Sequence, residues 1–336
     1  MSVNIGVIGL GIGAVHVDSL SRISDAKMVA FADLDEARVQ QFAQKHGAHA
    51  YTDWNAMLEN ESELDAVILA TPARVRREPI RAICERKLAL FCEKPPAMNL
   101  QEALQIRDAI EDANILNAVG FMYRWSPLAF KMWELIAERP RLFARTVVAW
   151  PVFDWVMDGK APRNLLQKSS CGGPLIEQAI HYQDVLRYIT GDEPVAVQAM
   201  AEIGNLIPRK DRNCEETTAY LLRHESGMLS THVHNWSHKS TLMEIQIVGD
   251  SYHLTWDMAG NSMRLTGNWE SKEINETCES QCYFQEMEGF VQAVKTRDQN
   301  LIRSSYSDAC KTLAVCEAGA KAVTFNCAVS IPDTGS

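Results

Sequence analysis

Glu93, Lys94 and Pro95 form the stretch of this sequence with the clearest potential for chemistry. They follow Leu88–Cys92, an apolar run that predicts a buried parallel strand. Ligands bind outside the carboxyl ends of the strands in open α/β sheets, so a lysine here can present its ammonium group to a ligand. Pro95 also disfavours α geometry at Lys94 and predicts an extended backbone. An isolated Lys-Pro pair is usually an ordinary strand end that reaches solvent, so the surrounding motifs must decide.

A glycine loop follows the first apolar run of the chain. The residues expected to bind a cofactor there are Gly9, Leu10, Gly11, Ile12, Gly13 and Ala14. The spacing fits either GxGxxA, with Ala14 as the last small residue, or a GxGxG loop one residue shorter than usual. Both patterns place backbone amides at a helix N-terminus, which favours a pyrophosphate.

Asp33 follows the glycines by about 20 residues, where an acid binds the ribose hydroxyls of a dinucleotide. Its carboxylate would repel a 2′-phosphate, so we expect NAD(H) to be preferred. The nearby Arg38 leaves NADP(H) open. The alternative is that Asp33 caps the helix expected from Asp35.

Two further segments are expected at the same sheet edge. Thr71 and Pro72, which follow the strand predicted for Asp65–Ala70, suit the wall of a nicotinamide or ribose pocket, although a tight β–α turn explains them equally. Glu93 and Lys94 are expected to contact the cofactor as well, because all these strands would end at one edge.

A helix in the second half carries a histidine. Gly172-Gly173-Pro174 predicts its start and Gly191 its end. Four polar residues are spaced to share one face of it, namely Glu177, His181, Asp184 and Tyr188. Histidine titrates near neutrality, which suits proton transfer, and Glu177 would orient the ring or raise its pKa. The alternative is a solvated polar stripe.

The elements that position these residues fall into two patterns. The first ~120 residues alternate apolar strands with helices, which predicts an α/β domain with a doubly wound parallel Rossmann sheet, assigned to residues 1–122. Residues 123–336 contain longer strands with few helices between them, which predicts an α+β domain with a large, mostly antiparallel, open sheet. Its expected strands are Val147–Trp150, Val195–Ala201, Thr217–Leu222, Met228–Trp236, Leu242–Val248 and Ser251–Trp256.

The composition argues against several classes of partner. The 336 residues carry a formal net charge of −10 and have a pI near 5.4, so neither nucleic acid nor an anionic membrane is an expected partner. No apolar run approaches the roughly 18 residues of a membrane span, and the N-terminus lacks the charged region of a signal peptide. Nine cysteines without a CxxC pair favour reduced thiols and a cytoplasmic location.

Together these motifs resemble the glucose–fructose oxidoreductase/inositol dehydrogenase (Gfo/Idh/MocA) family over nearly the whole chain. The segments that carry the resemblance are Gly9–Gly13, Ala70-Thr71-Pro72, Glu93-Lys94-Pro95, Val119–Arg124 and Gly172-Gly173 with His181 and Asp184. The resemblance implies an NAD(P)-dependent dehydrogenase that acts on a secondary alcohol or ketone of a sugar, inositol or related polyol. It also implies a homodimer or homotetramer formed through the C-terminal sheet.

The resemblance assigns roles to individual residues. Lys94 and His181 would be catalytic, with the proximal base left open between them, and Glu177 would assist where the family usually has aspartate. Arg76 stands where a histidine is frequent. The expected substrate-binding residues are Tyr123, Arg124, Trp125, Arg163, Asn164 and Asp184, although packing at the domain junction explains the first three equally. A glycosidase that oxidises its substrate transiently with bound NAD is the alternative. A sensor without turnover would need neither Lys94 nor His181.

Three histidines that fall, together with a tryptophan, at two-residue spacing raise the question of a metal site. His232, His234 and His238 would lie on one strand face with Trp236. Carboxylates at a conventional ligand spacing are missing nearby, so no metal is expected. The alternative is a sheet face that packs against another subunit or lines a polyol pocket.

Overall fold

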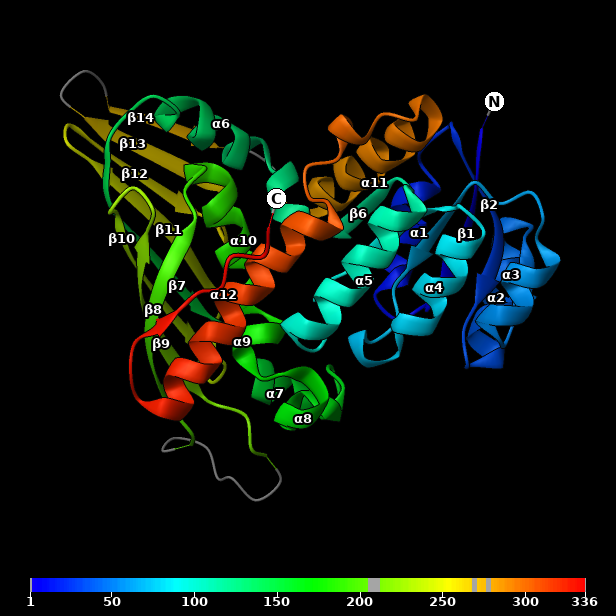
Figure 1. The fold of residues 1–336 in the computed structure, drawn as a ribbon, viewed down its shortest axis with the longest axis horizontal. Helices are drawn as coiled ribbons and strands as arrows, with labels where there is room; N and C mark the ends of the chain where they lie inside the picture. Colours follow the sequence, from blue (N-terminus) through cyan, green and yellow to red (C-terminus); the bar gives the residue numbers. More distant parts are fainter. Residues whose placement is uncertain (1, 205–211, 268–270, 276–278, 336) are drawn as a thin grey trace. The chain divides into compact units, whose positions relative to one another are not determined.

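The structure is a computed structural model that describes residues 2–204, 212–267, 271–275 and 279–335 (Figure 1). The chain forms two compact units: unit 1 contains Met1–Trp125 and Ser280–Cys310, and unit 2 contains Ser126–Glu279 and Lys311–Gly335. The sequence predicts two continuous domains, 1–122 and 123–336, whereas each observed unit combines two separate segments of the chain. Residues 280–310 belong to unit 1 because Met287, Phe290 and Val291 complete its hydrophobic core.

Unit 1 contains the parallel sheet that the sequence predicts. Six strands lie in the order β3-β2-β1-β4-β5-β6 and all neighbours are parallel. The strand order reverses between β1 and β4, which is the point where doubly wound sheets bind ligands. The strands are β1 Val3–Ile8, β2 Ala26–Ala32, β3 His49–Tyr51, β4 Ala66–Leu69, β5 Ala89–Glu93 and β6 Asn117–Gly120. The Rossmann architecture is therefore confirmed.

The helices of unit 1 follow the expected alternation. They are α1 Gly13–Leu20, α2 Glu36–His46, α3 Trp54–Asn60, α4 Arg77–Glu85, α5 Leu100–Ala113 and α11 Glu279–Thr296, with 3₁₀ turns at η1 Ala73–Val75, η2 Met122–Trp125 and η4 Gln299–Leu301. Asn99 caps α5 by accepting a hydrogen bond from the Glu102 amide, a role for which asparagine is among the preferred residues. The short elements β3 and α3 were not predicted, because three and seven residues show too little periodicity.

Unit 2 contains an open sheet of nine strands among the described residues, in the order β14-β13-β12-β11-β7-β10-β9-β8-β15. Only the β7–β10 pair is parallel within that described sheet, so the mostly antiparallel prediction is confirmed. The strands are β7 Arg141–Ala149, β8 Pro194–Glu202, β9 Thr217–His224, β10 Leu229–Asn235, β11 Leu242–Gly249, β12 Tyr252–Asp257, β13 Ser262–Gly267, β14 Ser271–Asn275 and β15 Val329–Ser330. Buried and exposed residues alternate along β9 and β10, so one face of the sheet is covered.

Helices cover that buried face. Leu175, Val315, Ala318 and Ala322 pack against side chains of β8 and β9. The helices are α6 Pro127–Ile136, α7 Val152–Met157, α8 Lys168–Cys171, α9 Pro174–Glu177, α10 Ala179–Thr190 and α12 Tyr306–Phe325, with the 3₁₀ turn η3 Arg163–Leu166. No helix of the described residues has the length and apolar character needed to cross a membrane.

The prediction of a single helix from Pro174 to Thr190 is wrong, because the helix is interrupted at Gln178. This residue adopts φ −124° and ψ −43° between α9 and α10. Oε1 of Gln178 accepts hydrogen bonds from His234 Nε2 at 3.0 Å and Trp236 Nε1 at 2.6 Å. A donor on β10 and a second one on the residue that follows this strand thus bind Gln178 at the break, and helical periodicity in the sequence does not predict such a contact.

Candidate active site

The glycine loop meets the steric demands of close backbone approach. Gly9 has φ +90°, and a Cβ there would lie 2.8 Å from the Ala70 carbonyl oxygen. Gly11 has open space around it, whereas a Cβ on Gly13 would lie 3.2 Å from the Ala70 Cβ. Because α1 begins at the buried Gly13, Gly13 takes the third glycine's role of close helix packing. This arrangement fits the shorter GxGxG pattern and leaves Ala14 in the first turn of α1.

The loop also leaves amides for an anion. Within the described residues, the N–H groups of Gly11, Ile12 and Gly13 donate to no protein acceptor. The first N–H groups of a helix lack intrahelical partners and carry the positive end of its dipole. The loop therefore fits the pyrophosphate of a dinucleotide.

Asp33 is bound to the glycine loop rather than to a helix cap. Its Oδ2 accepts a hydrogen bond from the Leu10 amide at 2.6 Å, and its Oδ1 accepts from the Asp35 amide at 2.9 Å. Asp35, not Asp33, caps α2 by accepting from the Arg38 amide. The capping alternative for Asp33 is therefore wrong. Arg38 also lies 3.6 Å from Asp33 Oδ1, so a carboxylate and a guanidinium both stand at this position.

Glu93 is a buried carboxylate with specific partners. His16, buried on α1, donates from Nε2 to Glu93 Oε1 at 2.6 Å, and the Lys94 amide donates to Oε2 at 3.0 Å. Burial alone would raise the pKa of the Glu93 carboxyl. The hydrogen bond and charge of His16, followed by the charges of Lys94 and Arg76, outweigh burial and lower this pKa to about 2. Glu93 is therefore an ionised structural partner at neutral pH.

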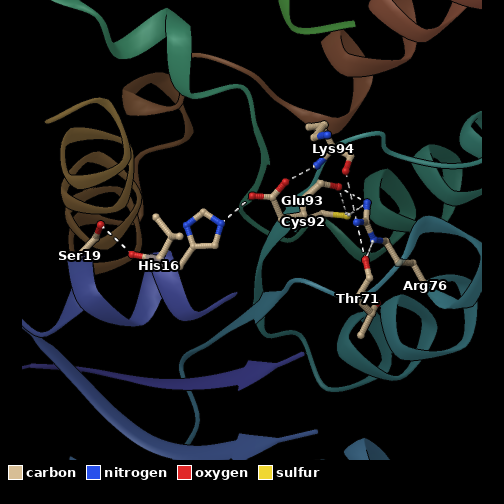
Figure 2. A network of polar contacts seen from close by, with 8 residues as sticks. His16, Ser19, Thr71, Arg76, Cys92, Glu93 and Lys94 are labelled. Atoms are coloured by element: carbon tan, nitrogen blue, oxygen red, sulfur yellow. Dashed lines mark hydrogen bonds and ion pairs between the residues drawn. The ribbon is translucent and has the colours of Figure 1, made fainter. Parts of the chain in front are cut away.

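Arg76 lies on the other side of Lys94, as Figure 2 shows. Its guanidinium is buried and donates to the carbonyl oxygens of Thr71, Glu93 and Pro95. The Lys94–Pro95 peptide bond is cis. Thr71 Oγ1 is buried and has no hydrogen-bond partner among the described residues, which fits a polar ligand at this edge. Thr71, Glu93 and Lys94 therefore meet at one edge of the sheet, as the sequence predicts.

His181 lies in the first turn of α10 in unit 2 and is 9 % exposed. Because of the break at Gln178, Glu177 ends α9, so the expected common helical face of Glu177 and His181 is wrong. Asp184 is fully buried, and its Oδ1 accepts a hydrogen bond from Thr312 Oγ1 at 3.0 Å. The same hydroxyl accepts from Arg187 Nη1 at 2.6 Å. Asp184 thus has an internal role, and its predicted contact with substrate stays a prediction.

Positive φ values explain the glycine pair before α9. Gly172 and Gly173 have φ +79° and +77°. A Cβ on Gly172 would lie 2.7 Å from the Ile176 Cβ, and one on Gly173 would lie 2.7 Å from Glu215 Oε2. These glycines admit a tight approach at the start of the segment that carries His181.

The histidines of β10 form a buried network. His232 and His234 stack at 5.4 Å, and His232 Nε2 lies 3.2 Å from His234 Nδ1. Burial lowers the pKa of His232 to about 3; burial, then His232 and His181, lower that of His234. His238 lies apart, exposed beyond the end of the strand. No group of three potential metal ligands occurs among the residues that the structure describes.

The aromatic–arginine run after β6 packs inside unit 1. Arg124 Nη1 donates to the Arg303 carbonyl at 2.5 Å, and Nη2 pairs with Asp308. The Arg303 guanidinium lies 4.4 Å from the Trp125 ring centroid, and Tyr123 is buried. These contacts favour the packing alternative, so substrate binding by these residues stays a prediction.

Two further substrate-binding candidates in unit 2 are exposed, unlike Tyr123 and Arg124. Arg163 and Asn164 lie in η3 and are exposed. Their role in substrate binding therefore also remains a prediction.

Sequence reasoning missed His16 as a site residue. It lies on α1 three residues after Gly13 and four before Leu20, and all three are buried. A polar residue at this helical spacing on a buried face was the available signal. Its ring contacts Phe91 and Tyr283 edge-on, with centroids 5.0 and 5.7 Å away.

Comparisons with known proteins agree with this arrangement. Residues 3–121 match the family model "Oxidoreductase family, NAD-binding Rossmann fold", and residues 144–255 match the GFO/IDH/MocA C-terminal domain. The chain is 29% identical to myo-inositol 2-dehydrogenase of Thermotoga maritima over 67% of this chain and 66% of that protein. It is 28% identical to scyllo-inositol 2-dehydrogenase (NAD(+)) of Bacillus subtilis over 60% of this chain and 58% of that protein.

The chain thus matches less than two thirds of the length of each of these two curated relatives. The solved structure of levoglucosan dehydrogenase in complex with NADH shares the fold, with a TM-score of 0.87 at 19% identity. That similarity covers 99% of this chain and 100% of the other.

The Glu93 carboxyl predicts acid sensitivity. Its folded-state pKa lies below the ordinary 4.5, at about 2, so its contribution to stability is present above pH 4.5 and is lost as pH falls towards 2. By linkage this difference corresponds to roughly 3 kcal/mol. We expect Glu93→Gln to be less stable than the wild type at pH 6, with a gap that narrows in acid, as measured by urea denaturation. A gap that stays constant from pH 6 to pH 3 would contradict this assignment.

Proposed function

The chain belongs to the GFO/IDH/MocA oxidoreductase family, and from this membership we propose that it is an NAD(H)-dependent dehydrogenase of polyols. It would transfer hydride between nicotinamide and a secondary alcohol or ketone of a sugar, inositol or related polyol. The observation that carries the proposal is Lys94, which follows β5 at the carboxyl edge of the sheet and is anchored on both sides through Glu93 and Arg76. The relatives named above are inositol dehydrogenases, which supports this substrate class.

The proposed cofactor site uses two groups of unit 1. The free amides of Gly11, Ile12 and Gly13 would bind the pyrophosphate, and Asp33 would bind the adenosine ribose. When bound, the nicotinamide supplies hydride acceptance and donation. Asp33 favours NAD(H), because its carboxylate repels a 2′-phosphate, while Arg38 moderates that preference.

The proposed catalytic groups are Lys94 in unit 1 and His181 in unit 2. The Lys94 ammonium would donate a hydrogen bond to the reacting oxygen and stabilise alkoxide charge as it develops. His181 would exchange the hydroxyl proton as general acid and base. Glu177 would assist His181, although the two residues lie in different helices, α9 and α10.

We also propose that the open sheet of unit 2 joins copies of the chain into a homodimer or homotetramer. Large apolar side chains are exposed on five of its strands, at Met200, Leu221, Leu229, Phe143 and Leu242. Leu229 and Phe143 are register partners on β10 and β7, so the apolar surface is continuous there. Contiguous exposed apolar surface is typical of interfaces.

Turnover provides the direct test of the proposed activity. A panel of inositols and sugars with NAD⁺ should yield NADH, followed by absorbance. Lys94→Met and His181→Asn should each lower kcat by about a hundredfold or more, while NADH affinity, measured by fluorescence, stays within a few-fold. Glycoside hydrolysis without net NADH would instead identify the NAD-assisted glycosidase. Full activity of both variants would refute the assigned roles.

Cofactor preference tests the role of Asp33. Asp33→Asn keeps an acceptor for the Leu10 amide and removes the charge that opposes a 2′-phosphate. We expect the ratio of kcat/KM for NADP⁺ to that for NAD⁺ to rise by about tenfold, or about 1.4 kcal/mol. The companion variant Arg38→Ala should lower the same ratio. A wild type that prefers NADP⁺ would overturn the assignment.

The assembly proposal is tested by a charge placed on the sheet. Leu229→Glu, at a residue 47 % exposed, should shift the wild-type oligomer towards monomer in sedimentation velocity. Phe325→Glu, on the exposed side of α12, is the matched control and should leave the oligomer intact. A monomeric wild type, or an oligomer that Leu229→Glu leaves unchanged, would exclude this interface.

A further inference from the structure

Arg76 is an unusual cation for its place in unit 1. It directly precedes α4 and is only 2 % exposed, whereas its neighbours Arg74 and Arg77 are exposed. A buried charge is costly unless hydrogen bonds replace its hydration. The partners of this guanidinium therefore reveal what the burial accomplishes.

Those partners are backbone carbonyls from two separate segments. Nε and Nη2 donate to the Thr71 carbonyl at 2.8 and 2.5 Å. Nη1 donates to the carbonyls of Pro95, at 2.5 Å, and Glu93, while Nη2 reaches the Lys94 carbonyl at 3.4 Å. Figure 2 shows the fork between the Thr71 turn and the segment that carries Lys94. One side chain thus connects the ends of β4 and β5.

The connection begins where the sheet pairing stops. The β4–β5 register runs from Ala66↔Ala89 to Leu69↔Cys92 and does not continue to Thr71 or Lys94. Beyond Cys92, hydrogen bonds from the Arg76 guanidinium connect the two chain segments in place of strand pairing. On the opposite side, Glu93 Oε2 accepts the Lys94 amide. Both the N–H and the C=O of Lys94 are therefore held by buried charged groups.

We propose that Arg76 is a positioning residue that fixes the backbone of Lys94, so that the ammonium group is presented in one orientation to the reacting oxygen. The catalytic part of this inference rests on the proposed dehydrogenase function. The planar guanidinium is suited to the task, because its five N–H donors form a rigid fork. A lysine would offer a single ammonium that cannot span the same carbonyls.

The test compares Arg76→Ala and Arg76→Lys with Arg77→Ala, which removes the same charge from the adjacent exposed position. Backbone hydrogen exchange of peptides that cover residues 88–98 is measured by mass spectrometry without added cofactor. Steady-state kcat and KM are measured with the polyol that the wild type oxidises best. Both are repeated for Arg76→Ala with guanidinium chloride in the low tens of millimolar.

The expected result is specific to position 76. Loss of the charged hydrogen bonds should speed exchange at the end of β5 by about tenfold or more in Arg76→Ala. Its kcat should fall by about a hundredfold, the scale of a 1 Å misplacement, with KM changed far less. Arg76→Lys should recover only part of both, guanidinium should restore part of both, and Arg77→Ala should match the wild type.

Several outcomes would overturn the inference. Unchanged exchange in a folded Arg76→Ala would show that the carbonyls need no guanidinium. Faster exchange with wild-type kcat, or without any response to guanidinium, would show a purely structural role. A wild type that oxidises no polyol would instead contradict the proposed function, and the exchange measurement would then decide alone whether Arg76 holds the Lys94 backbone.

Discussion

Two buried charged groups hold the peptide of a single lysine, and the candidate site of unit 1 depends on that constraint. The Glu93 carboxylate accepts the Lys94 amide and receives a hydrogen bond from His16, while Arg76 binds the carbonyls around Lys94. Each charge would be costly to bury alone, and each is compensated by the others and by the backbone. Because His16 belongs to α1, the network also ties the helix of the glycine loop to the strand that carries the lysine.

The same principle recurs in unit 2 with neutral groups. Gln178 accepts from His234 and Trp236 at the break between α9 and α10, and the His232–His234 pair remains neutral because burial lowers both pKa values. Hydrogen bonds from β10 and from the residue after it therefore hold the chain at the start of α10, the helix that carries His181. In both units a network of polar groups holds the backbone segment that carries a candidate catalytic side chain.

Much of the fold was predictable because its signals are local. Alternating strands and helices predict the parallel sheet, and the Asn99 cap and the start of α5 follow from residues within one turn. The location of the candidate site was predictable because the carboxyl ends of parallel strands lie at the same end of the sheet. Asp33, Thr71 and Lys94 each follow such a strand end, so no long-range information is needed to place them there. The return of residues 280–310 to unit 1, the break at Gln178 and the packing of Arg124 with Asp308 depend on contacts across large sequence separations. No single-sequence pattern encodes such contacts, and the same is true of the His16–Glu93 pair.

The central claim is that the anchored Lys94 contacts the reacting oxygen of a polyol beside a bound dinucleotide. A crystal structure with NADH and a polyol that the protein oxidises tests it most directly. The account predicts the pyrophosphate against the amides of Gly11–Gly13, a ribose on Asp33, and the Lys94 ammonium within hydrogen-bond distance of a substrate hydroxyl. A complex in which the hydroxyl nearest the nicotinamide has no contact with Lys94 would contradict it.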